Sequence, residues 1–384
     1  MREGLRTEGS ALKLLALSPV PAEGAGCRFR IVQYVPALEQ AGFSVTIAPF
    51  FDARFFDLVY RPGHYVEKFG AFLRQSLARL KLLMSRDSYD AFFVYREAYP
   101  FGPPLVETLL AHAHGRPLVY DFDDAIFLSN SSEANRFASA LKYPQKVAGI
   151  IRRSALVLAG NEYLANYARA YNTAVSVLPT CVDTKVFVPR QTPRAARDPI
   201  VVGWIGTPTT VPYLKSLGPS LSRLASRHPF ALRVSGSGEP IDFSGVTTVN
   251  ERWSLEREVE LFNTCDIGVY PLTDDEWAKG KCGFKAIQFM ACGVPVVAAA
   301  VGVNREIIQD GVNGLLASTE QEWAEKVGRL LCDGDLRRRL GAAGRRTIEE
   351  KYSLAVNAPK LASLLREAVR ANRGALAPGV REVA

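Results

Sequence analysis

The sequence predicts an α/β protein made of two Rossmann-like domains, each a parallel sheet covered by helices. With 384 residues the chain is longer than one ordinary domain. In both halves, short apolar runs typical of buried parallel strands alternate with helical patterns. Between the halves, residues 189–199 combine proline, arginine and small residues without hydrophobic periodicity, which predicts a linker. We therefore expect domains over residues 1–190 and 198–352, and a terminal helix with a disordered tail within 353–384.

Composition narrows the class of protein without naming a ligand. The formal net charge of +8 suits an anionic ligand, an acidic lipid surface or nucleic acid. No motif beyond charge supports nucleic acid, so we do not expect it as a partner. The six cysteines form neither a metal-like pairing nor a dense framework, which favours a reducing compartment. The N-terminus does not resemble a signal peptide and no apolar run approaches the roughly 20 residues of a membrane-spanning helix, so we expect a cytoplasmic protein.

The N-terminal half opens as a strand–loop–helix unit. Residues 12–17 predict a strand, and residues 28–40 predict an amphipathic helix after a loop that contains Gly24 and Gly26. The loop is not Gly-x-Gly-x-x-Gly, which argues against a dinucleotide-binding fingerprint. Residues 43–49 predict the second strand.

An aromatic segment and a basic helix come next. Residues 50–56 are rich in phenylalanine, and residues 66–86 predict one helix. Its apolar stripe consists of Phe69, Phe72, Leu73, Leu77, Leu80 and Met84, and its polar side carries Lys68, Arg74, Arg79, Lys81 and Arg86. A basic amphipathic helix beside exposed aromatic side chains can lie on an anionic membrane, so peripheral membrane contact is one expectation. The alternative is that the stripe faces the core of the domain.

Three carboxylates end a strand in the middle of the N-terminal half. The run that begins at residue 118 predicts a strand followed by Asp121, Asp123 and Asp124, at the carboxyl end where α/β proteins bind ligands. Asp121 and Asp123 flank Phe122, which leaves a metal-binding Asp-x-Asp as an alternative, and Asp124 also suits a helix cap. The other elements expected in this half are strands over 91–95, 155–159 and 175–178 and helices over 105–114, 138–153 and 161–171.

The second half opens with a strand over residues 200–205, followed by Gly206, Thr207 and a helix predicted over 213–227. Hydroxyl groups and backbone N–H groups at a helix start suit phosphate. Further strands are expected over 231–234 and 246–249, and a helix over 255–264 begins just after Trp253.

Residues 279–297 form the most informative stretch of the chain. A strand predicted over 267–272 leads into a basic glycine loop, a helix over 284–292 and a buried strand over 294–300. The order of these elements places the loop at the carboxyl end of a strand.

The spacing of polar residues in this stretch predicts an anion site. Lys281, Lys285 and Gln288 are four and three residues apart, so we expect them on one face of the helix start. Two cations, backbone N–H groups near Gly283 and the positive end of the helix dipole together suit a diphosphate. The alternative is a solvated basic turn.

Gly283-Phe284 followed by Gln288-Phe289-Met290-Ala291-Cys292-Gly293-Val294-Pro295-Val296-Val297 resembles the donor-site signature of retaining nucleotide-sugar glycosyltransferases of family four. These enzymes have the GT-B fold. The resemblance, strongest over residues 200–352, implies two Rossmann-like domains that face each other across a cleft. It further implies an acceptor-binding first domain, a donor-binding second domain and a terminal helix that returns to the first.

The chain departs from this signature at two positions. The first glutamate of the signature falls on Gly280 and the second on Gln288. Lys281 and Lys285 stand where the family has small or apolar residues, and would compensate for the family's arginine and lysine after the strand over 200–205, which have no clear match. The absent glutamates leave a catalytically silent nucleotide-sugar binding protein as an alternative. An epimerase or a phosphorylase on the same architecture is another.

The resemblance implies a donor site in the second domain. Lys281, Lys285 and the helix start at Gly283 and Phe284 would hold the diphosphate, and Gln288 the ribose. Gly206 and Thr207 would lie beside the phosphates, and Trp253 would stack on the base or else be a core side chain.

The same resemblance implies an acceptor side in the first domain. The loop with Gly24 and Gly26 would face the acceptor, with Arg30 adding charge there or lying on the helix surface. Asp123 takes the place of a family histidine over the reacting sugar, and Asp124 that of the aspartate after it. We expect retaining transfer from a nucleotide-diphosphate sugar to a glycan or lipid-linked acceptor, with no cofactor and no metal, because the two lysines stabilise the leaving diphosphate.

Overall fold

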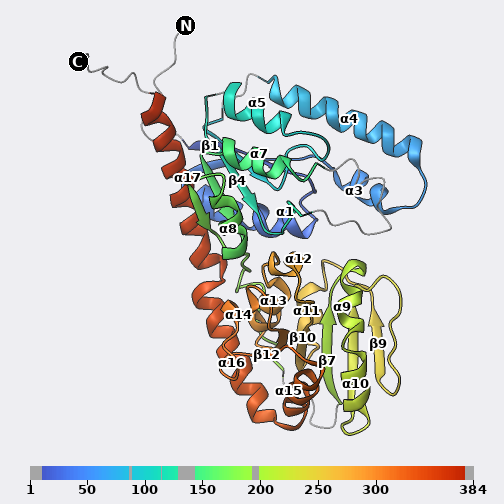
Figure 1. Ribbon diagram of the computed structural model, residues 1–384. Coiled ribbons are helices and arrows are strands. Elements are labelled where there is room, and N and C mark those ends of the chain that lie inside the picture. Colours follow the sequence, from blue (N-terminus) through green and yellow to red (C-terminus); the bar gives the residue numbers. More distant parts are fainter. Residues whose placement is uncertain (1–10, 86–88, 114, 129–142, 193–198, 377–384) are drawn as a thin grey trace. The chain divides into compact units, whose positions relative to one another are not determined.

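The computed structural model describes residues 11–85, 89–113, 115–128, 143–192 and 199–376 (Figure 1). These residues divide into two compact units. Unit 1 comprises the described residues up to Pro179 and those from Ala358 onward, and unit 2 comprises Thr180–Asn357. Each unit contains its own six-stranded sheet, as an α/β chain with two Rossmann-like domains predicts. The ligand-binding roles expected of the two domains stay predictions.

The sheet of unit 1 has the strand order β2-β1-β3-β4-β5-β6, with every pair parallel. Every side chain of β3 and β4 is buried, and all except Asp121 are apolar or aromatic, which explains the apolar character of these strands in the sequence. The strands are β1 (Leu12–Ser18), β2 (Phe43–Pro49), β3 (Ala91–Tyr95), β4 (Leu118–Phe122), β5 (Leu156–Ala159) and β6 (Val175–Val177).

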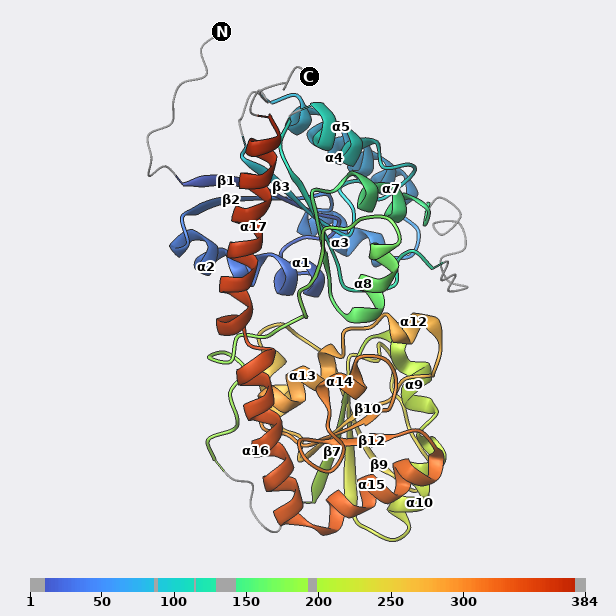
Figure 2. The same ribbon diagram turned by 60° about the vertical axis from the view of Figure 1, so that its left-hand side comes forward.

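Helices connect these strands, and α1 and α2 lie toward one edge of the sheet while α8 lies toward the other (Figure 2). The single helix predicted over 28–40 is wrong. The chain forms α1, a 3-10 turn and α2 instead, because it leaves helical geometry at Ile31 and restarts with Pro36 in the first turn of α2. The helices of this part are α1 (Ala25–Arg30), α2 (Val35–Gln40), α3 (Ala53–Tyr60), α4 (Tyr65–Leu83), α5 (Leu105–Ala113), α7 (Lys146–Arg153) and α8 (Glu162–Arg169).

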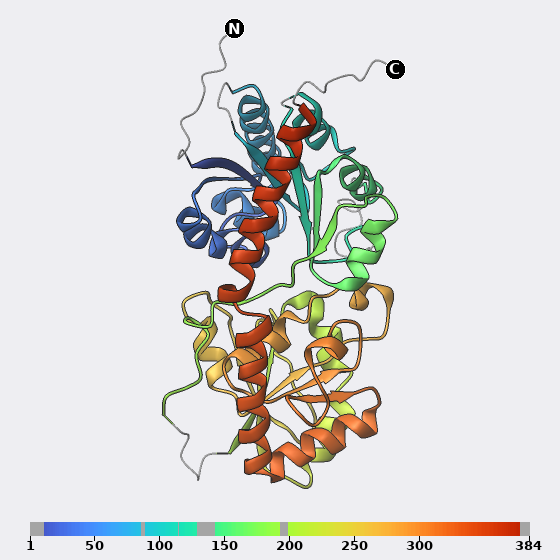
Figure 3. The same ribbon diagram turned by 90° about the vertical axis from the view of Figure 1, so that its left-hand side faces the viewer.

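The terminal helix α17 (Leu354–Leu376) runs across unit 1 (Figure 3). Its polar side chains bind three separate loops and strand ends, two of them through backbone carbonyls and one through a carboxylate. Lys360 Nζ donates to the carbonyl of Val177 over 2.7 Å, and Asn372 Nδ2 donates to that of Gly115 over 2.9 Å. Arg373 pairs with Asp90 at 3.0 Å. The tail expected to be disordered lies outside the described residues, as do most of the expected linker and the start of the helix predicted over 138–153.

The sheet of unit 2 has the order β12-β11-β10-β7-β8-β9, again with every pair parallel. Its core gathers Val202, Val234, Ile267, Val297 and Leu315 from five strands, all fully buried. The strands are β7 (Ile200–Ile205), β8 (Phe230–Ser235), β9 (Thr247–Glu251), β10 (Ile267–Tyr270), β11 (Val296–Ala299) and β12 (Leu315–Ala317).

The helix predicted over 213–227 is also split, into α9 and α10. Pro219 lies in the first turn of α10, where its missing N–H costs no intrahelical hydrogen bond. The helices of unit 2 are α9 (Val211–Lys215), α10 (Gly218–Ala225), α11 (Glu258–Asn263), α12 (Glu276–Lys279), α13 (Phe284–Ala291), α14 (Asn304–Ile307), α15 (Glu320–Cys332) and α16 (Gly334–Lys351). Within the described ranges, no helix is long and apolar enough to cross a bilayer.

Candidate active site

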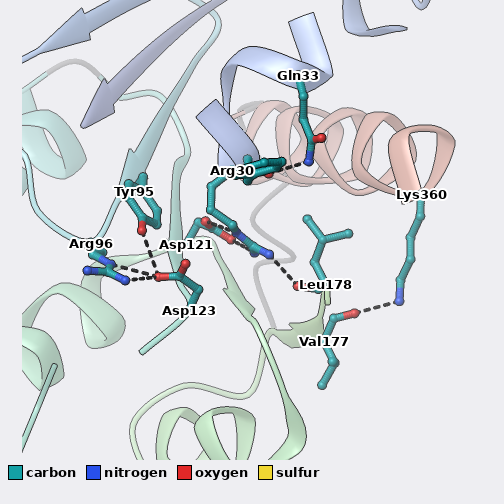
Figure 4. Close-up of polar contacts among 10 residues, drawn as sticks. Arg30, Gln33, Tyr95, Arg96, Asp121, Asp123, Val177, Leu178 and Lys360 are labelled. Atoms are coloured by element: carbon teal, nitrogen blue, oxygen red, sulfur yellow. Dashed lines mark hydrogen bonds and ion pairs between the residues drawn. The ribbon is translucent and has the colours of Figure 1, made fainter. Parts of the chain in front are cut away.

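The loops after three neighbouring strands meet at the carboxyl edge of the sheet in unit 1. β1, β3 and β4 are adjacent, and the segments that follow them carry Gly24 and Gly26, then Arg96, then Asp123. Because parallel strands end at the same edge, residues distant in sequence come together here (Figure 4).

Arg30 and Asp121 form a buried ion pair at this edge. Arg30 Nε donates to Asp121 Oδ2 over 2.9 Å, Nη2 donates to the other carboxylate oxygen, and Nη1 donates to the carbonyl of Leu178 over 2.9 Å. Neither side chain has any exposed surface. The guanidinium thus ties α1 to β4 and to the end of β6. This burial differs from the acceptor-facing or surface position expected of Arg30, because a partner 91 residues away neutralises its charge.

Asp123 lies beside the buried pair and has its own arginine. It accepts hydrogen bonds from the Tyr95 hydroxyl over 2.9 Å and from Nε and Nη2 of Arg96 over 2.8 and 2.6 Å. Arg96 also donates to Asp124, so the two neighbouring carboxylates share one guanidinium. The side chain of Asp123 is 15% exposed, which leaves it an outlet to solvent.

An unusual backbone conformation aims Arg96 at these carboxylates. Arg96 has a φ of +58°, in the left-handed region that non-glycine residues adopt at some cost. Its own N–H donates to the carbonyl of Asp121 over 2.7 Å, which fixes the turn after β3 against β4. Strain of this kind is most common at functional sites.

The charge of Asp123 is set by these neighbours. Burial acts to raise the pKa of Asp123, but the positive charges of Arg96 and Arg30, with the hydrogen bonds from Arg96 and Tyr95, lower it below its ordinary value. Asp123 is therefore ionised at neutral pH. A carboxylate with a lowered pKa is a weak base, so its chemistry is that of a fixed negative charge and a hydrogen-bond acceptor.

Gly26 makes room for this arrangement. A Cβ at Gly26 would lie 2.3 Å from the hydroxyl oxygen of Tyr95, so a larger residue in α1 would push Tyr95 away from Asp123. Gly26 therefore allows the Tyr95 hydroxyl to stay within hydrogen-bond distance of Asp123. Gly24 caps α1 with extended backbone geometry and donates its N–H to the carbonyl of Pro21 over 3.0 Å.

Asp121 and Asp123, the alternative metal ligands, each pair with a different arginine, Asp121 with Arg30 and Asp123 with Arg96. They do not share a position for a common metal ion. Across the described residues, no group of three or more His, Cys, Asp or Glu side chains is arranged to hold a metal ion. The expectation of a metal-independent reaction stays a prediction.

In unit 2, the basic glycine loop follows β10, passes through α12 and enters α13 at Gly283. Gly283 has a φ of +65°, and a Cβ there would lie 2.3 Å from Cδ1 of Ile307 in α14. Only glycine fits this close approach without strain. The start of α13, with the positive end of its dipole, thus lies at the carboxyl edge of the sheet.

Lys281 is not on α13, so the prediction that it shares a helix face with Lys285 is wrong. The helix begins at Phe284, because left-handed Gly283 interrupts the helical path, and Lys281 lies in the turn before it. The Lys281 ammonium sits 5.6 Å from the ring centroid of Trp277. Lys281 belongs to the same loop as predicted, but its position depends on α12.

Lys285 and Gln288 do lie together on α13. Lys285 Nζ donates to Gln288 Oε1 over 2.8 Å, and lies 5.6 Å from the ring centroid of Phe284. Gln288 is fully buried, and its Nε2 donates to Glu258 Oε1 of α11 over 3.2 Å. Glu258, itself buried, therefore puts a carboxylate beside the position where the family signature has its second glutamate.

The loops after β7, β8 and β9 form a second group at the same edge. Gly206 donates its N–H to the carbonyl of Ser235 over 3.0 Å, and Thr207 caps the following 3-10 turn with exposed hydroxyl groups. A Cβ at Gly236, where φ is +83°, would lie 2.3 Å from the carbonyl oxygen of Gly206 and 3.4 Å from Cβ of Trp253. Because Gly236 has no side chain, the backbone of Gly206 and the side chain of Trp253 can both lie close to it. Trp253 is 36% exposed and so is not a core side chain.

Comparison with known proteins identifies this unit. Residues 201–333 match the family model described as glycosyl transferases group 1. Over this segment the chain is similar to the group 1 glycosyltransferases. The D-inositol 3-phosphate glycosyltransferase of Stackebrandtia nassauensis is 30% identical over 212 residues, which cover 47% of this chain and 46% of that protein. An uncharacterized glycosyltransferase of Methanocaldococcus jannaschii is 33% identical over 104 residues, 27% of this chain and 28% of that protein. These matches span about half or less of the relatives' length.

Solved structures show that the chain has the GT-B fold. Sucrose-phosphate synthase from Thermosynechococcus elongatus superposes with a TM-score of 0.67 at 18% identity, over 94% of this chain and all of that one. Anabaena HepE, in complex with UDP and glucose, gives a TM-score of 0.65 at 17% identity, over 93% of this chain and all of that one.

Several residues of the candidate site were not predicted from the sequence. Tyr95 and Arg96 end the strand next to β4, so the rule that carboxyl ends of neighbouring strands meet would have found them. Gly236 lies in a Ser-Gly-Ser-Gly run after a buried strand, a visible signal for a ligand-lining turn. No sequence pattern indicated Glu258, because its hydrogen bond with Gln288 depends on the packing of α11 against α13.

Proposed function

We propose that the protein transfers a sugar from a nucleotide-diphosphate sugar to an acceptor hydroxyl, with retention at the anomeric carbon, in glycan or glycolipid biosynthesis. Unit 2 binds the donor, and unit 1 serves the acceptor. The observation that carries the proposal is Lys285 at the start of α13, in a segment that matches the group 1 glycosyltransferases. The cytoplasmic location expected from the sequence stays a prediction.

The donor side follows from charge. A departing nucleoside diphosphate gains negative charge as the glycosidic bond breaks, and preorganised cations and helix dipoles stabilise it. Lys285 has its ammonium held by Gln288, and Gln288 is held in turn by Glu258. Such a chain of contacts fixes the cation before the donor arrives. Lys281, in the same loop, adds a second cation. Gln288 is fully buried, so its role is to position Lys285 and not to contact the ribose as the resemblance implied.

The base and sugar are suggested by proteins of the same fold. Anabaena HepE was solved with UDP-glucose, at a TM-score of 0.63 and 15% identity to this chain. UDP-sugars are therefore the first donors to test. Thr207 and Trp253 offer the hydroxyl and aromatic groups that a phosphate and a base would contact, whereas the N–H of Gly206 is already donated to the carbonyl of Ser235.

The acceptor side follows from Asp123. As a partly exposed carboxylate that is ionised at neutral pH, it can accept a hydrogen bond from a sugar hydroxyl and balance positive charge that develops at the anomeric carbon. Arg96 and Tyr95 hold it in place, and Asp124 shares the same arginine. The acceptor itself is a glycan or a lipid-linked saccharide.

Donor turnover tests this proposal. The purified full chain is incubated with a panel of UDP-, GDP- and ADP-sugars, with and without simple glycoside acceptors, and release of nucleoside diphosphate is measured. We expect slow hydrolysis of one donor class alone and faster release with an acceptor. Proton NMR of the product should show the same anomeric configuration as the donor. An inverted product would overturn the assignment of retention.

A second candidate function is a nucleotide-sugar binding protein without turnover. Gly280 and Gln288 favour it, because they stand where the family signature has its two glutamates. Tight calorimetric binding of a donor that is neither hydrolysed nor transferred, over a day and across acceptors, would establish this candidate. Conversion of the donor into a different nucleotide sugar without acceptor would instead indicate an epimerase.

A further inference from the structure

Helix α4 of unit 1 presents an apolar face to solvent along its whole length. Seven apolar side chains between residues 65 and 84 are each 50–86% exposed: Tyr65, Val66, Phe69, Leu73, Leu77, Leu80 and Met84. Six of them, from Val66 to Met84, recur at intervals of three or four residues, so they form one continuous stripe. The alternative that the stripe faces the domain core is wrong for all of its members except Phe72.

The opposite face of α4 holds the helix on unit 1. Phe72 packs at 5.6 Å from Phe50 and 5.4 Å from Phe101, measured between ring centroids. Ser76 contacts the hydroxyl of Tyr99 at 2.9 Å, and Arg79 donates to the carbonyl of Ala48 over 3.0 Å. The exposed stripe therefore has no part in attaching α4, and α4 lies along the periphery of its unit (Figure 1).

An exposed apolar stripe of this length indicates a binding partner that covers it. A soluble surface rarely keeps a contiguous apolar patch without a partner, and a helix with one apolar and one charged side binds in the plane of a membrane interface. Phe50 and Phe55, which the sequence suggested as exposed aromatics, are buried, and Phe51 and Phe56 are half-buried, so α4 supplies most of the apolar face.

Charge decides between the two natural occupants, a lipid surface and a second copy of the chain. Between residues 50 and 85 there are six Lys and Arg and three Asp and Glu. Arg79 is buried, so five cations against three carboxylates leave a formal charge of +2 outside the core. Arg74 and Lys81 are both exposed along one border of the stripe, Arg74 also pairing with Asp52 at 3.3 Å. Pairing two copies through this face would bring like charges together in a chain that is already +8. An anionic lipid surface attracts them instead.

We propose that α4 is an interfacial helix that docks this protein on an anionic membrane. The helix lies in the plane of the surface, with the stripe from Val66 to Met84 inserted among the lipid headgroups and upper acyl chains, and with Arg74 and Lys81 at the phosphate level. This inference does not depend on the proposed sugar transfer, since it rests on the face of α4 alone.

Flotation with vesicles tests the docking surface. The full chain is mixed with vesicles of phosphatidylcholine alone or with 30% phosphatidylglycerol, at low and at high salt. We expect flotation with the anionic vesicles at low salt, and at least tenfold less with neutral vesicles. The variant F69S/L73S/L77S should lose at least tenfold of the anionic binding, and Lys81→Glu should lose part of it. A matched control, V312S/V356S, removes exposed apolar side chains from unit 2 and should float like the wild type.

Two measurements keep the result decisive. Circular dichroism melting should show that the triple variant is as stable as the wild type, because its substitutions lie on exposed positions. Sedimentation velocity without lipid should show a monomer. A dimer that the triple variant abolishes, with no lipid binding by the wild type, would assign the face to a second copy and overturn the proposal. Flotation that the triple variant leaves unchanged would overturn it as well.

Discussion

The guanidinium of Arg96 donates two hydrogen bonds to a single carboxylate oxygen of Asp123, over 2.8 and 2.6 Å. The two residues directly follow the neighbouring strands β3 and β4 and lie 27 positions apart in the chain. Arg96 makes this contact from a left-handed backbone conformation. Gly26 has no side chain, which leaves room for the Tyr95 hydroxyl that also donates to Asp123. Three elements of unit 1 thus cooperate to hold one ionised carboxylate at the carboxyl edge of the sheet.

Replacing Asp123 with Asn should slow turnover by about a hundredfold and leave diphosphate affinity nearly unchanged. The amide keeps the shape of the side chain but removes the charge that Arg96 and Tyr95 hold. Steady-state kinetics with the active donor, and calorimetry with the nucleoside diphosphate, separate the two effects. Asp57→Asn, at an exposed position of α3, is the matched control and should be silent. If chelation abolished wild-type activity and manganese restored it, a metal role for Asp121 and Asp123 would replace the charge role.

The same carboxylate makes the stability of the protein depend on pH. Since Asp123 has a folded pKa below its ordinary value of 3.8, it stabilises the fold fully above that value. The contribution is lost as pH falls through the lower folded pKa. Urea unfolding followed between pH 7 and pH 2 should therefore show a smaller acid-induced loss of stability in Asp123→Asn than in the wild type. Parallel curves for the two proteins over the whole range would contradict the lowered pKa.

Gly26→Ala should impair both stability and turnover. The added Cβ would meet the Tyr95 hydroxyl at 2.3 Å, so Tyr95 or α1 must shift, at a cost of about 1–3 kcal/mol for overpacking. Thermal unfolding and steady-state kinetics measure the two effects. Gly374→Ala, in a helix where an added Cβ meets no atom within 4 Å, serves as the control and should be neutral or slightly stabilising. Wild-type kinetics in Gly26→Ala would mean that Tyr95 does not need its present position.

Much of this fold was accessible from sequence because buried parallel strands have a plain signature. The predicted strands over 43–49 and 91–95 match β2 and β3 to the residue. β3 is an uninterrupted apolar run, and β2 alternates apolar and polar residues at its start, both of which are patterns typical of strands. Helix continuity was harder to predict. Hydrophobic periodicity continues through Ile31 into α2, and only the backbone at Ile31 reveals the break.

The candidate site was accessible in outline but not in its pairings. Asp123 and Lys285 were both predicted, because each follows a strand or loop of distinctive composition. Arg30 was expected to face an acceptor, but its partner Asp121 lies 91 positions away and only the folded sheet brings them together. The prediction that Lys281 shares a helix face with Lys285 was wrong for a local reason, because the left-handed conformation of Gly283 separates Lys281 from α13.

Gln288→Glu, which restores the family's glutamate, should destabilise unit 2. The new carboxylate would stand where the amide now donates to Glu258 at 3.2 Å, so two buried like charges would meet. A loss of roughly 1–3 kcal/mol is expected for an unsatisfied buried group, measured by denaturant unfolding at pH 8. The exchanged pair E258Q/Q288E should recover most of it, because one amide and one carboxylate are again adjacent. A Gln288→Glu protein as stable as the wild type at this pH would contradict the pairing.

The central claim is that Lys285 at the start of α13 binds the diphosphate of the donor. Isothermal calorimetry with a nucleoside diphosphate on Lys285→Ala, Lys281→Ala and Lys279→Ala tests it most directly. Lys279 is the control, since its ammonium pairs with Glu276 at 2.7 Å on exposed surface. We predict a large loss of affinity for Lys285→Ala, a smaller loss for Lys281→Ala and almost none for Lys279→Ala. Turnover of Lys285→Ala should fall in parallel, by roughly 2–4 kcal/mol in transition-state terms. Equal and small losses at all three positions would reveal a diffuse basic surface and contradict the site.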